Sequence, residues 1–383
     1  MGCGLKLVYE MICSKTFPFL FLSLVVLAPF MAFSCGKTDG VRRGTAYVVE
    51  LDDDIARMII QDDGGVTGGD GMYSVPLPDG RSVFLMGDSY TGKVTGNTRG
   101  TSDHMFRNSY QIYDNGRVLA VTTDATHSAA VPPGHPDEDK WYWPGDGFAR
   151  DGVLYVFQLL MYQGAPGAWG FRYEETHLLE YSLPDLKLLR DSKTPYSGDA
   201  SVIFGAAALD DGEWIYVYAQ ADGEGGDPFN PVSNAYCART TAGDIHDRWE
   251  YFTGSGWSED FSQAEIMSGL SDVPVSSQFN VFRLRDKYVL LTQHKFLGDG
   301  KIFTFTSDTP YGPWTNKRQI FKVPDLGDKD WFAYNAMAHP QFEKDGMILF
   351  SFNVNTNVFS QQFSDVRSYR PRFFWYPVDE IVD

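Results

Sequence analysis

The sequence has little cysteine where a folded domain could use it. Of its four cysteines, Cys3, Cys13 and Cys35 lie within the first 35 residues, which leaves only Cys237 in the rest of the chain. A disulfide within that part is therefore excluded, and seven histidines are too few to suggest a zinc site. Cys237 lies in an apolar, strand-like stretch, which predicts a buried structural thiol rather than a nucleophile.

Positive charge is also scarce. The 32 lysines and arginines face 50 aspartates and glutamates, so the formal net charge is −18. Nucleic acids and anionic membrane surfaces are bound by basic faces. The composition therefore predicts no nucleic-acid partner and favours neutral ligands, although a local pocket around Arg99, Arg107 or Arg172 could still accept an anion.

Motifs for nucleotides, metals and nucleophilic serine are missing or incomplete. Residues 87–94 resemble a phosphate-binding loop, but Val94 stands where the metal-binding hydroxyl residue is needed, so we predict no nucleotide. The acidic clusters at residues 52–54 and 62–63 lack the spacing of a calcium loop, and no Gly-x-Ser-x-Gly elbow occurs. We predict neither a metal nor another cofactor.

A long hydrophobic run occurs only near the N-terminus. Residues 16–33 are almost entirely apolar, follow two lysines, and lead into Ser34 and Cys35. The run is shorter than the roughly 20 apolar residues of a spanning helix, and its end resembles a lipobox. We therefore predict a lipoprotein signal peptide over residues 1–34, lipidation of Cys35, and export to the outer membrane on its periplasmic or surface side. An uncleaved anchor helix is the alternative.

Long amphipathic helical periodicity is absent, and a hairpin recurs instead. Five apolar segments each run into a turn and out into a second apolar segment. The turns lie at residues 79–80, 151–152, 211–212, 286–287 and 345–346, and four of them are Asp-Gly, which favours type I′ turns. They recur every 59 to 75 residues, which leaves room for the four strands of a propeller blade.

This repetition predicts an all-β protein, a five-bladed β-propeller over residues 64–383. Residues 35–63 are predicted to contain a tether and a segment that we leave unassigned. Two stacked sandwich domains are the alternative, because hairpins alone do not prove that the sheets close into a ring.

Acidic residues are predicted to gather at one mouth of the propeller funnel. Residues eight or nine positions from a turn return to that mouth, and these are Asp70 and Asp88 in the first repeat. Strict strand pairing would point them to opposite faces, so their approach requires a bulge or a twisted strand end. Asp146 lies at the same mouth in the second repeat. Three such carboxylates are typical of glycosidic cleavage, although aspartates beside glycine or serine also cap turns and strand ends.

Further polar and aromatic residues at the mouth are predicted to bind substrate. Trp143 would stack on a sugar face, and His339 would donate a hydrogen bond, unless it is a buried structural histidine. Arg107 either reaches the funnel or packs between blades. The predicted substrate contacts are Arg107, Asn108, Trp143, Asn335 and His339.

Several segments resemble, in order, the landmarks of a bacterial five-bladed propeller family that was long catalogued as a domain of unknown function. They are residues 68–71, 85–89, 107–109, 143–147, 311–314 and 339–340. Some members of that family are regarded as endo-acting D-arabinan hydrolases, and their fold is similar to that of arabinanases and fructosidases. The resemblance implies hydrolysis by Asp70, Asp88 and Asp146. Ser89 departs from the threonine expected after Asp88.

We therefore predict a lipid-anchored glycoside hydrolase that cleaves a polysaccharide, with an arabinan as one candidate. Asp70 would be the base or nucleophile, Asp146 the general acid, and Asp88 the residue that tunes their pKa values. Retention or inversion depends on the carboxylate separation and stays open. A non-catalytic glycan-binding lipoprotein, which needs Trp141, Trp143 and Trp169 but no protonated carboxylate, is the alternative. A third reading, a partner-binding propeller, predicts no sugar affinity.

Overall fold

The computed structural model of the protein describes residues 42–43, 46–47, 49–101, 103–121, 128–133, 140–224, 226, 231–295 and 299–383. The predicted signal peptide and Cys35 lie outside these residues. In this part of the chain, no helix is long and apolar enough to cross a membrane.

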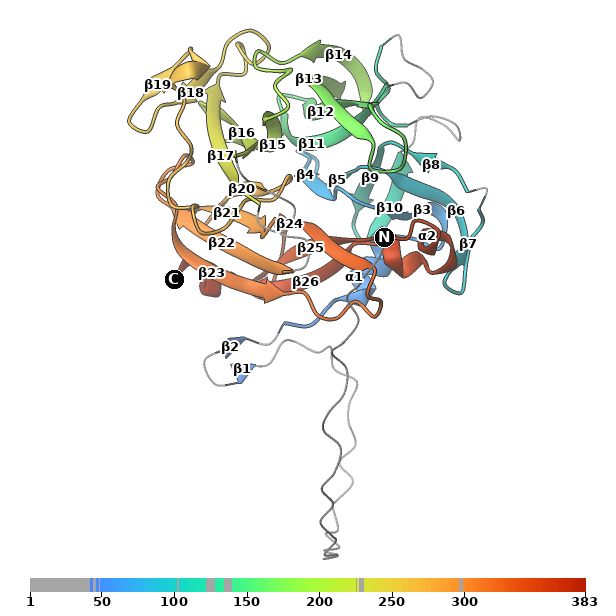
Figure 1. Ribbon diagram of the computed structural model, residues 1–383. Helices are drawn as coiled ribbons and strands as arrows, with labels where there is room; N and C mark the ends of the chain where they lie inside the picture. Colours follow the sequence, from blue (N-terminus) through green and yellow to red (C-terminus); the bar gives the residue numbers. More distant parts are fainter. Residues whose placement is uncertain are drawn as a thin grey trace, which may run out of the picture. The chain divides into compact units, whose positions relative to one another are not determined.

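Five antiparallel sheets follow one another in the sequence (Figure 1). The first contains β4 (Tyr73–Pro76), β5 (Ser82–Met86), β9 (Ser109–Asp114) and β10 (Arg117–Val121). The second contains β11 (Lys140–Arg150), β12 (Val153–Gln163), β13 (Phe171–Ser182) and β14 (Lys187–Lys193). The third contains β15 (Val202–Asp210), β16 (Ile215–Asp222), β17 (Ser233–Thr240), β18 (Glu250–Phe252) and β19 (Trp257–Ser258). The fourth contains β20 (Asn280–Leu284), β21 (Lys287–Gln293), β22 (Lys301–Ser307) and β23 (Thr315–Lys322), and the fifth β24 (Trp331–Lys344), β25 (Met347–Thr356) and β26 (Arg372–Pro377).

The inner strands of these sheets form a closed ring. Strands β4, β11, β15, β20 and β24 contact one another in this order, and β24 contacts β4. A closed ring of radial sheets is a propeller, whereas two stacked sandwiches would leave the ring open. The predicted five-bladed all-β propeller is therefore confirmed, with each sheet as one blade.

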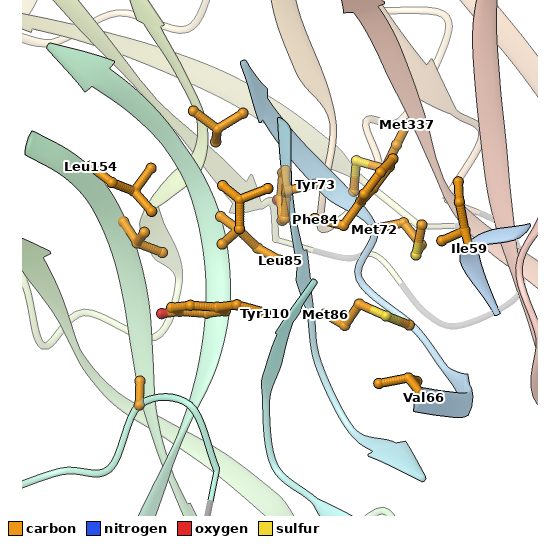
Figure 2. Packing of buried hydrophobic residues seen from close by; sticks show 14 of the residues in the cluster. Ile59, Val66, Met72, Tyr73, Phe84, Leu85, Met86, Tyr110, Leu154 and Met337 are labelled. Atoms are coloured by element: carbon orange, nitrogen blue, oxygen red, sulfur yellow. The ribbon is translucent and has the colours of Figure 1, made fainter. Parts of the chain in front are cut away.

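The blades are held together by apolar side chains between their faces. Strand β5 is buried at every position, as expected for a strand with a blade on either side. Figure 2 shows Phe84 and Leu85 of this blade in a buried cluster that also contains Leu154 of the second blade and Met337 of the fifth. The apolar run of β5 thus allows the first blade to pack against a neighbour on each face.

The predicted turns are present, but only some have the expected conformation. Positive φ at both central residues, typical of type I′, occurs at Asp151-Gly152 and Asp345-Gly346. At residues 79–80 and 211–212 only the glycine has positive φ. In these hairpins the strand pairing begins further from the turn, so the loops are longer than two residues. In the fourth blade the positive φ falls on Arg285, one residue before the predicted turn.

A small sheet beside the first blade was not predicted. It contains β3 (Asp63–Gly69), β6 (Ser89–Thr95), β7 (Thr98–Arg99) and β8 (Met105–Phe106). Two short helices near the C-terminus, α2 (Gln361–Ser364) and η2 (Val366–Tyr369), pack against it, and the rings of Phe363 and Tyr369 contact Tyr90 edge-on. The remaining short elements are η1 (Phe261–Gln263) and α3 (Asp379–Val382).

The segment before the first blade is fastened to the last one. Strands β1 (Arg42–Arg43) and β2 (Ala46–Tyr47) pair with each other, and α1 (Asp53–Ile59) follows. Leu51 forms a bridge with Phe374 of β26, and Asp52 caps α1 while accepting a hydrogen bond from Trp375 Nε1 at 2.9 Å. Ile59 is buried in the core. The stretch predicted as tether and unassigned segment therefore adds a helix to the core before residue 64.

Candidate functional site

Asp70 and Asp88 lie in the links between strands of two different sheets, the first blade and the small sheet beside it. Strand β3 pairs with β6, whereas β4 pairs with β5; Asp70 falls between β3 and β4, and Asp88 between β5 and β6. Gly71 makes the break with φ +89°, and a Cβ there would lie 2.8 Å from the Gly87 nitrogen. This is the strand-end irregularity that close approach of the two carboxylates requires.

The Asp70 carboxyl is surrounded by tyrosines. Its Oδ2 accepts a hydrogen bond from the Tyr334 hydroxyl at 2.5 Å, and the Tyr369 hydroxyl also interacts with it. Burial and the charge of Asp88 raise the pKa of Asp70 to about 7, more strongly than the two tyrosines lower it. Asp70 therefore retains its proton over a much wider pH range than an exposed aspartate.

The Asp88 carboxyl has partners that favour its charged form. Its Oδ1 accepts a hydrogen bond from Trp143 Nε1 at 2.8 Å, and its Oδ2 lies 3.5 Å from Arg107 Nη1. Burial raises the pKa of Asp88, while Arg107 and Trp143 oppose that rise. The Arg107 guanidinium also stacks on Trp141, 4.2 Å from the ring centre, which holds the cation in place.

Both aspartates lie on the wall of a cavity of about 830 Å³, which we call the main cavity. Residues of the second, third and fifth blades line it together with residues of the segments that adjoin the first and fourth, as expected at the mouth of a propeller. Its aromatic residues are Trp141, Trp143, Trp169, Phe171, Tyr173, Phe332, Tyr334, Phe359 and Tyr369, and its amides are Gln163, Gln220, Gln278, Asn335, Asn355, Asn357 and Gln362. Aromatic faces with many amides suit a ligand that has both apolar faces and hydroxyl groups.

Three of the predicted substrate contacts lie on this wall. Arg107, Trp143 and Asn335 all line the main cavity, and Trp143 lies next to Phe171, with ring centres 4.6 Å apart. Arg107 both stacks and faces the cavity, so the two roles left open for it coexist.

Asp146 does not join the pair on the cavity wall. It is 6% exposed, and its two oxygens accept hydrogen bonds from the backbone nitrogens of Gly147 at 2.9 Å and Ala208 at 3.0 Å. Burial raises its pKa to about 7. A bulge in β11 between Pro144 and Gly147 sets this orientation. Asp146 therefore ties the second blade to β15 of the third.

His339 and Asn108 also lie in the interior rather than on the cavity wall. The His339 ring contacts the hydroxyls of Ser74 at 2.7 Å and Ser351 at 2.9 Å, and burial lowers its pKa to about 3, so the ring is neutral. Asn108 donates to the backbone carbonyls of Ala130 and Tyr142. His339 is therefore a buried, hydrogen-bonded histidine, which was the alternative to a substrate contact.

Cys237 is buried, and burial raises the pKa of its thiol, in agreement with a structural residue. Within the described ranges, no group of three or more histidine, cysteine, aspartate or glutamate side chains is arranged to hold a metal ion.

Sequence reasoning missed the two tyrosines around Asp70. Tyr334 directly precedes the predicted Asn335 on β24, so its neighbour was a usable signal. Tyr369 lies in η2, outside every hairpin, and counting from turns could not reach it.

Known proteins resemble the chain in sequence and in fold. The family model described as "Domain of unknown function (DUF5005)" matches residues 55–376. Among curated proteins, none matches the chain.

A provisionally assigned hydrolase from Bacteroides ovatus ATCC 8483 has a TM-score of 0.70 and 21% identity, over 86% of this chain and 90% of that one. This likeness shows a shared fold. A GH43_1 enzyme from Xanthomonas citri in complex with xylotriose has a TM-score of 0.48 and 15% identity, over 85% and 92% of the two chains. An exo-1,5-alpha-L-arabinanase from a bovine ruminal metagenomic library has a TM-score of 0.46 and 12% identity, over 82% and 94%.

Proposed function

The chain belongs to the DUF5005 family, and we propose that it is a glycoside hydrolase that cleaves a neutral polysaccharide, with Asp70 and Asp88 as the reacting pair. The observation that carries the proposal is that these two carboxyls share one cavity but have different partners. Burial raises the pKa of both, to about 7 for Asp70, but only Asp88 has a cation, Arg107, beside it and an indole donor, Trp143, which oppose that rise. Glycosidic cleavage needs one protonated and one ionised carboxyl.

These surroundings support roles that differ from those expected from the sequence. Asp70 is the general acid, which gives its proton to the glycosidic oxygen as the bond to the leaving sugar breaks. Asp88 either attacks the anomeric carbon or takes a proton from the water that does so. The separation of the carboxyls decides between retention and inversion. Asp146 serves the packing of the blades, because backbone nitrogens occupy both of its oxygens.

The walls of the main cavity support a neutral substrate. Three carboxylates, Asp70, Asp88 and Asp222, line it, and Arg107 is the single cation among its described lining residues. Because Arg107 already pairs with Asp88, an acidic sugar would find no unpaired cation among the described lining residues. Trp143 and the exposed Trp169 offer faces on which sugar rings stack. A furanose-rich glycan such as an arabinan is the first substrate to test.

We propose further that the protein is exported and held at the outer membrane by lipid on Cys35, so that glycan and membrane are its two partners. The proposal rests on the apolar run and lipobox-like end of the leader. Growth with labelled palmitate should label the parent but not a Cys35→Ser variant. Equal labelling of both would contradict it.

The hydrolase proposal is tested by sugar release from a polysaccharide panel that includes arabinans and, as acidic members, uronic-acid polymers. The parent chain, started after Cys35, is compared with Asp70→Asn, Asp88→Asn and Asp146→Asn. We expect release from a neutral polymer, with a loss of about a hundredfold or more in the first two variants. Folded Asp146→Asn protein should keep its activity but be less stable.

Other outcomes would assign the protein differently. If folded Asp146→Asn protein is inactive while Asp88→Asn is active, Asp146 is the acid, as first predicted from the sequence. If no polymer is cleaved but all four proteins bind glycan equally, the protein is a glycan-binding lipoprotein.

A further inference from the structure

A second cavity of about 450 Å³ adjoins the main cavity, and we call it the side cavity. It lies among the third, fourth and fifth blades. The two cavities share Asp222, Ser277, Tyr334 and Asn335 as lining residues, so they meet along this common wall. Because the hydroxyl of Tyr334 donates to Asp70, the shared wall stands directly beside the proposed acid.

Asn335 is held on this shared wall in an unusual conformation. Its φ is +48°, and the pairing of β24 with β25 shifts between Tyr334 and Met337. Ser276 Oγ donates to Asn335 Oδ1 at 2.5 Å, and Asn335 Nδ2 donates to Gln278 Oε1 at 3.0 Å. Bulges and left-handed residues that are fixed by hydrogen bonds often redirect a side chain toward a ligand site.

Opposite charges from two blades meet on the wall of the side cavity, at Asp222 and Lys295. Asp222 ends β16 of the third blade, and Lys295 follows β21 of the fourth; the two form an ion pair. Gln220 Nε2 also donates to Asp222 Oδ1, at 2.8 Å, which orients the carboxylate. The Asp222 side chain remains 60% exposed, so it can accept further hydrogen bonds. A hydrogen-bond acceptor and a charged donor therefore stand side by side at the cavity surface.

We propose that the side cavity is a second sugar-binding subsite, which takes a neutral sugar residue with free neighbouring hydroxyl groups. The inference rests on the proposed hydrolase function. Asp222 accepts one hydroxyl and Lys295 donates to the next, while Asn335 fixes the sugar on the side that faces Asp70. A chain bound with one sugar on the aromatic wall of the main cavity continues past Asp70 into this subsite.

The charges on the wall exclude two other ligand classes. A uronic acid would meet the Asp222 carboxylate, and the positive charge of Lys295 is already compensated by that residue. An apolar group would cover the 60% exposed Asp222 carboxylate without offering it a hydrogen bond. Hydroxyl groups satisfy both an acceptor and a donor, which is why a neutral sugar fits.

The test measures binding along a ladder of linear arabino-oligosaccharides, from the disaccharide to the octasaccharide, by titration calorimetry. All proteins carry Asp70→Asn so that binding is measured without cleavage. We expect Lys295→Met to weaken binding of the longest oligosaccharides about tenfold and to leave the shortest unchanged. Lys317→Met is the matched control, because this exposed lysine pairs with Asp272 outside both cavities.

A second arm asks whether the hydroxyl groups donate to Asp222, because methyl ether oxygens can still accept from Lys295 but cannot donate. A per-O-methylated octasaccharide should bind the Asp70→Asn protein about tenfold more weakly or worse, and adding Asp222→Ala should weaken it no further. An equal effect of Lys295→Met at every length, no effect at any length, or no binding by any member would overturn the subsite. Length-dependent binding together with absent cleavage by the parent would retain the subsite and refute the hydrolase.

Discussion

Three aspartates, one buried and two partly buried, show how strongly surroundings decide the role of a residue. Asp70 lies among tyrosine hydroxyls, Asp88 beside a cation and an indole, and Asp146 between backbone nitrogens. The side chain is the same in each case. Burial raises the pKa of all three, and what differs is the set of partners that oppose this rise or fix the carboxyl in place.

The first prediction at this scale concerns the pH profile of activity. Activity should fall above about pH 7, as Asp70 loses its proton, and on the acidic side, as Asp88 gains one. Arg107 lowers the pKa of Asp88, so Arg107→Met should raise that pKa and move the acidic limb to higher pH. The profile of kcat/KM measures this. The exposed Arg283→Met is the control, and an unmoved acidic limb would refute the electrostatic role of Arg107.

The second prediction concerns stability. The pKa of Asp70 rises from 3.8 to about 7 on folding, so between these values the folded chain binds more protons than the unfolded chain. Stability from this group is therefore fully present below about pH 4 and is lost as the pH rises to about 7. Asp70→Asn, which cannot ionise, should raise the free energy of unfolding at pH 8 by about 4 kcal/mol and change it little at pH 4.

Denaturant unfolding at the two pH values measures this difference. Exposed Asp286→Asn serves as the control and should show no such pH dependence. A gain at pH 4 that equals the gain at pH 8 would show that ionisation of Asp70 is not the cause.

At the scale of elements, the inner strands of neighbouring blades approach each other closely. A Cβ on Gly145 of β11 would meet the carbonyl oxygen of Gly205 on β15 far inside van der Waals contact. A backbone atom cannot move aside as a side chain can, so the ring of inner strands tolerates only glycine here.

The third prediction follows from this contact. Gly145→Ala should lower the free energy of unfolding by about 2 kcal/mol, because it overpacks the second and third blades. Gly243→Ala is the matched control, since the nearest atom to its added Cβ is 3.9 Å away. Urea unfolding of both variants tests the prediction, and equal stabilities would contradict it.

The same scale explains what could be predicted from the sequence. Repeated apolar runs and turns predicted all five hairpins, because strand pairing between adjacent segments is a local property. Counting from turns also placed Asp70 and Asp88 at the mouth. It failed to orient Asp146, because the bulge in β11 changes which way that side chain points, and bulges leave no reliable sequence signal. Tyr369 was beyond reach, since its place depends on packing against β3 and β6, not on a repeat.

At the scale of the whole molecule, the segment before the first blade is attached to the outer strand, β26, of the last blade. The amide of Asp52 donates to the Phe373 carbonyl at 2.7 Å, and α1 buries Ile59 in the cluster of the first, second and fifth blades. The edge of the last blade thus receives the segment that precedes the first.

The fourth prediction tests this attachment. A chain that starts at residue 64 loses the Leu51 bridge, the Asp52 contacts and the buried Ile59 and Ile60, and should be less stable than one that starts at residue 49 by about 3 to 6 kcal/mol. Thermal unfolding of the two chains compares them. Equal midpoints would show that the segment before residue 64 is dispensable.

The contact between the first and the last part of the folded chain also affects when the proposed site can form during synthesis. Asp70 belongs to the first blade, whereas its partners Tyr334 and Tyr369 come from the last part of the chain. A ribosome must therefore finish almost the whole polypeptide before the proposed acid acquires its surroundings. Chains that are still being synthesised, or that have lost their C-terminal part, would lack these partners of Asp70. They would therefore not cleave glycans, and the proposed activity would be limited to complete chains.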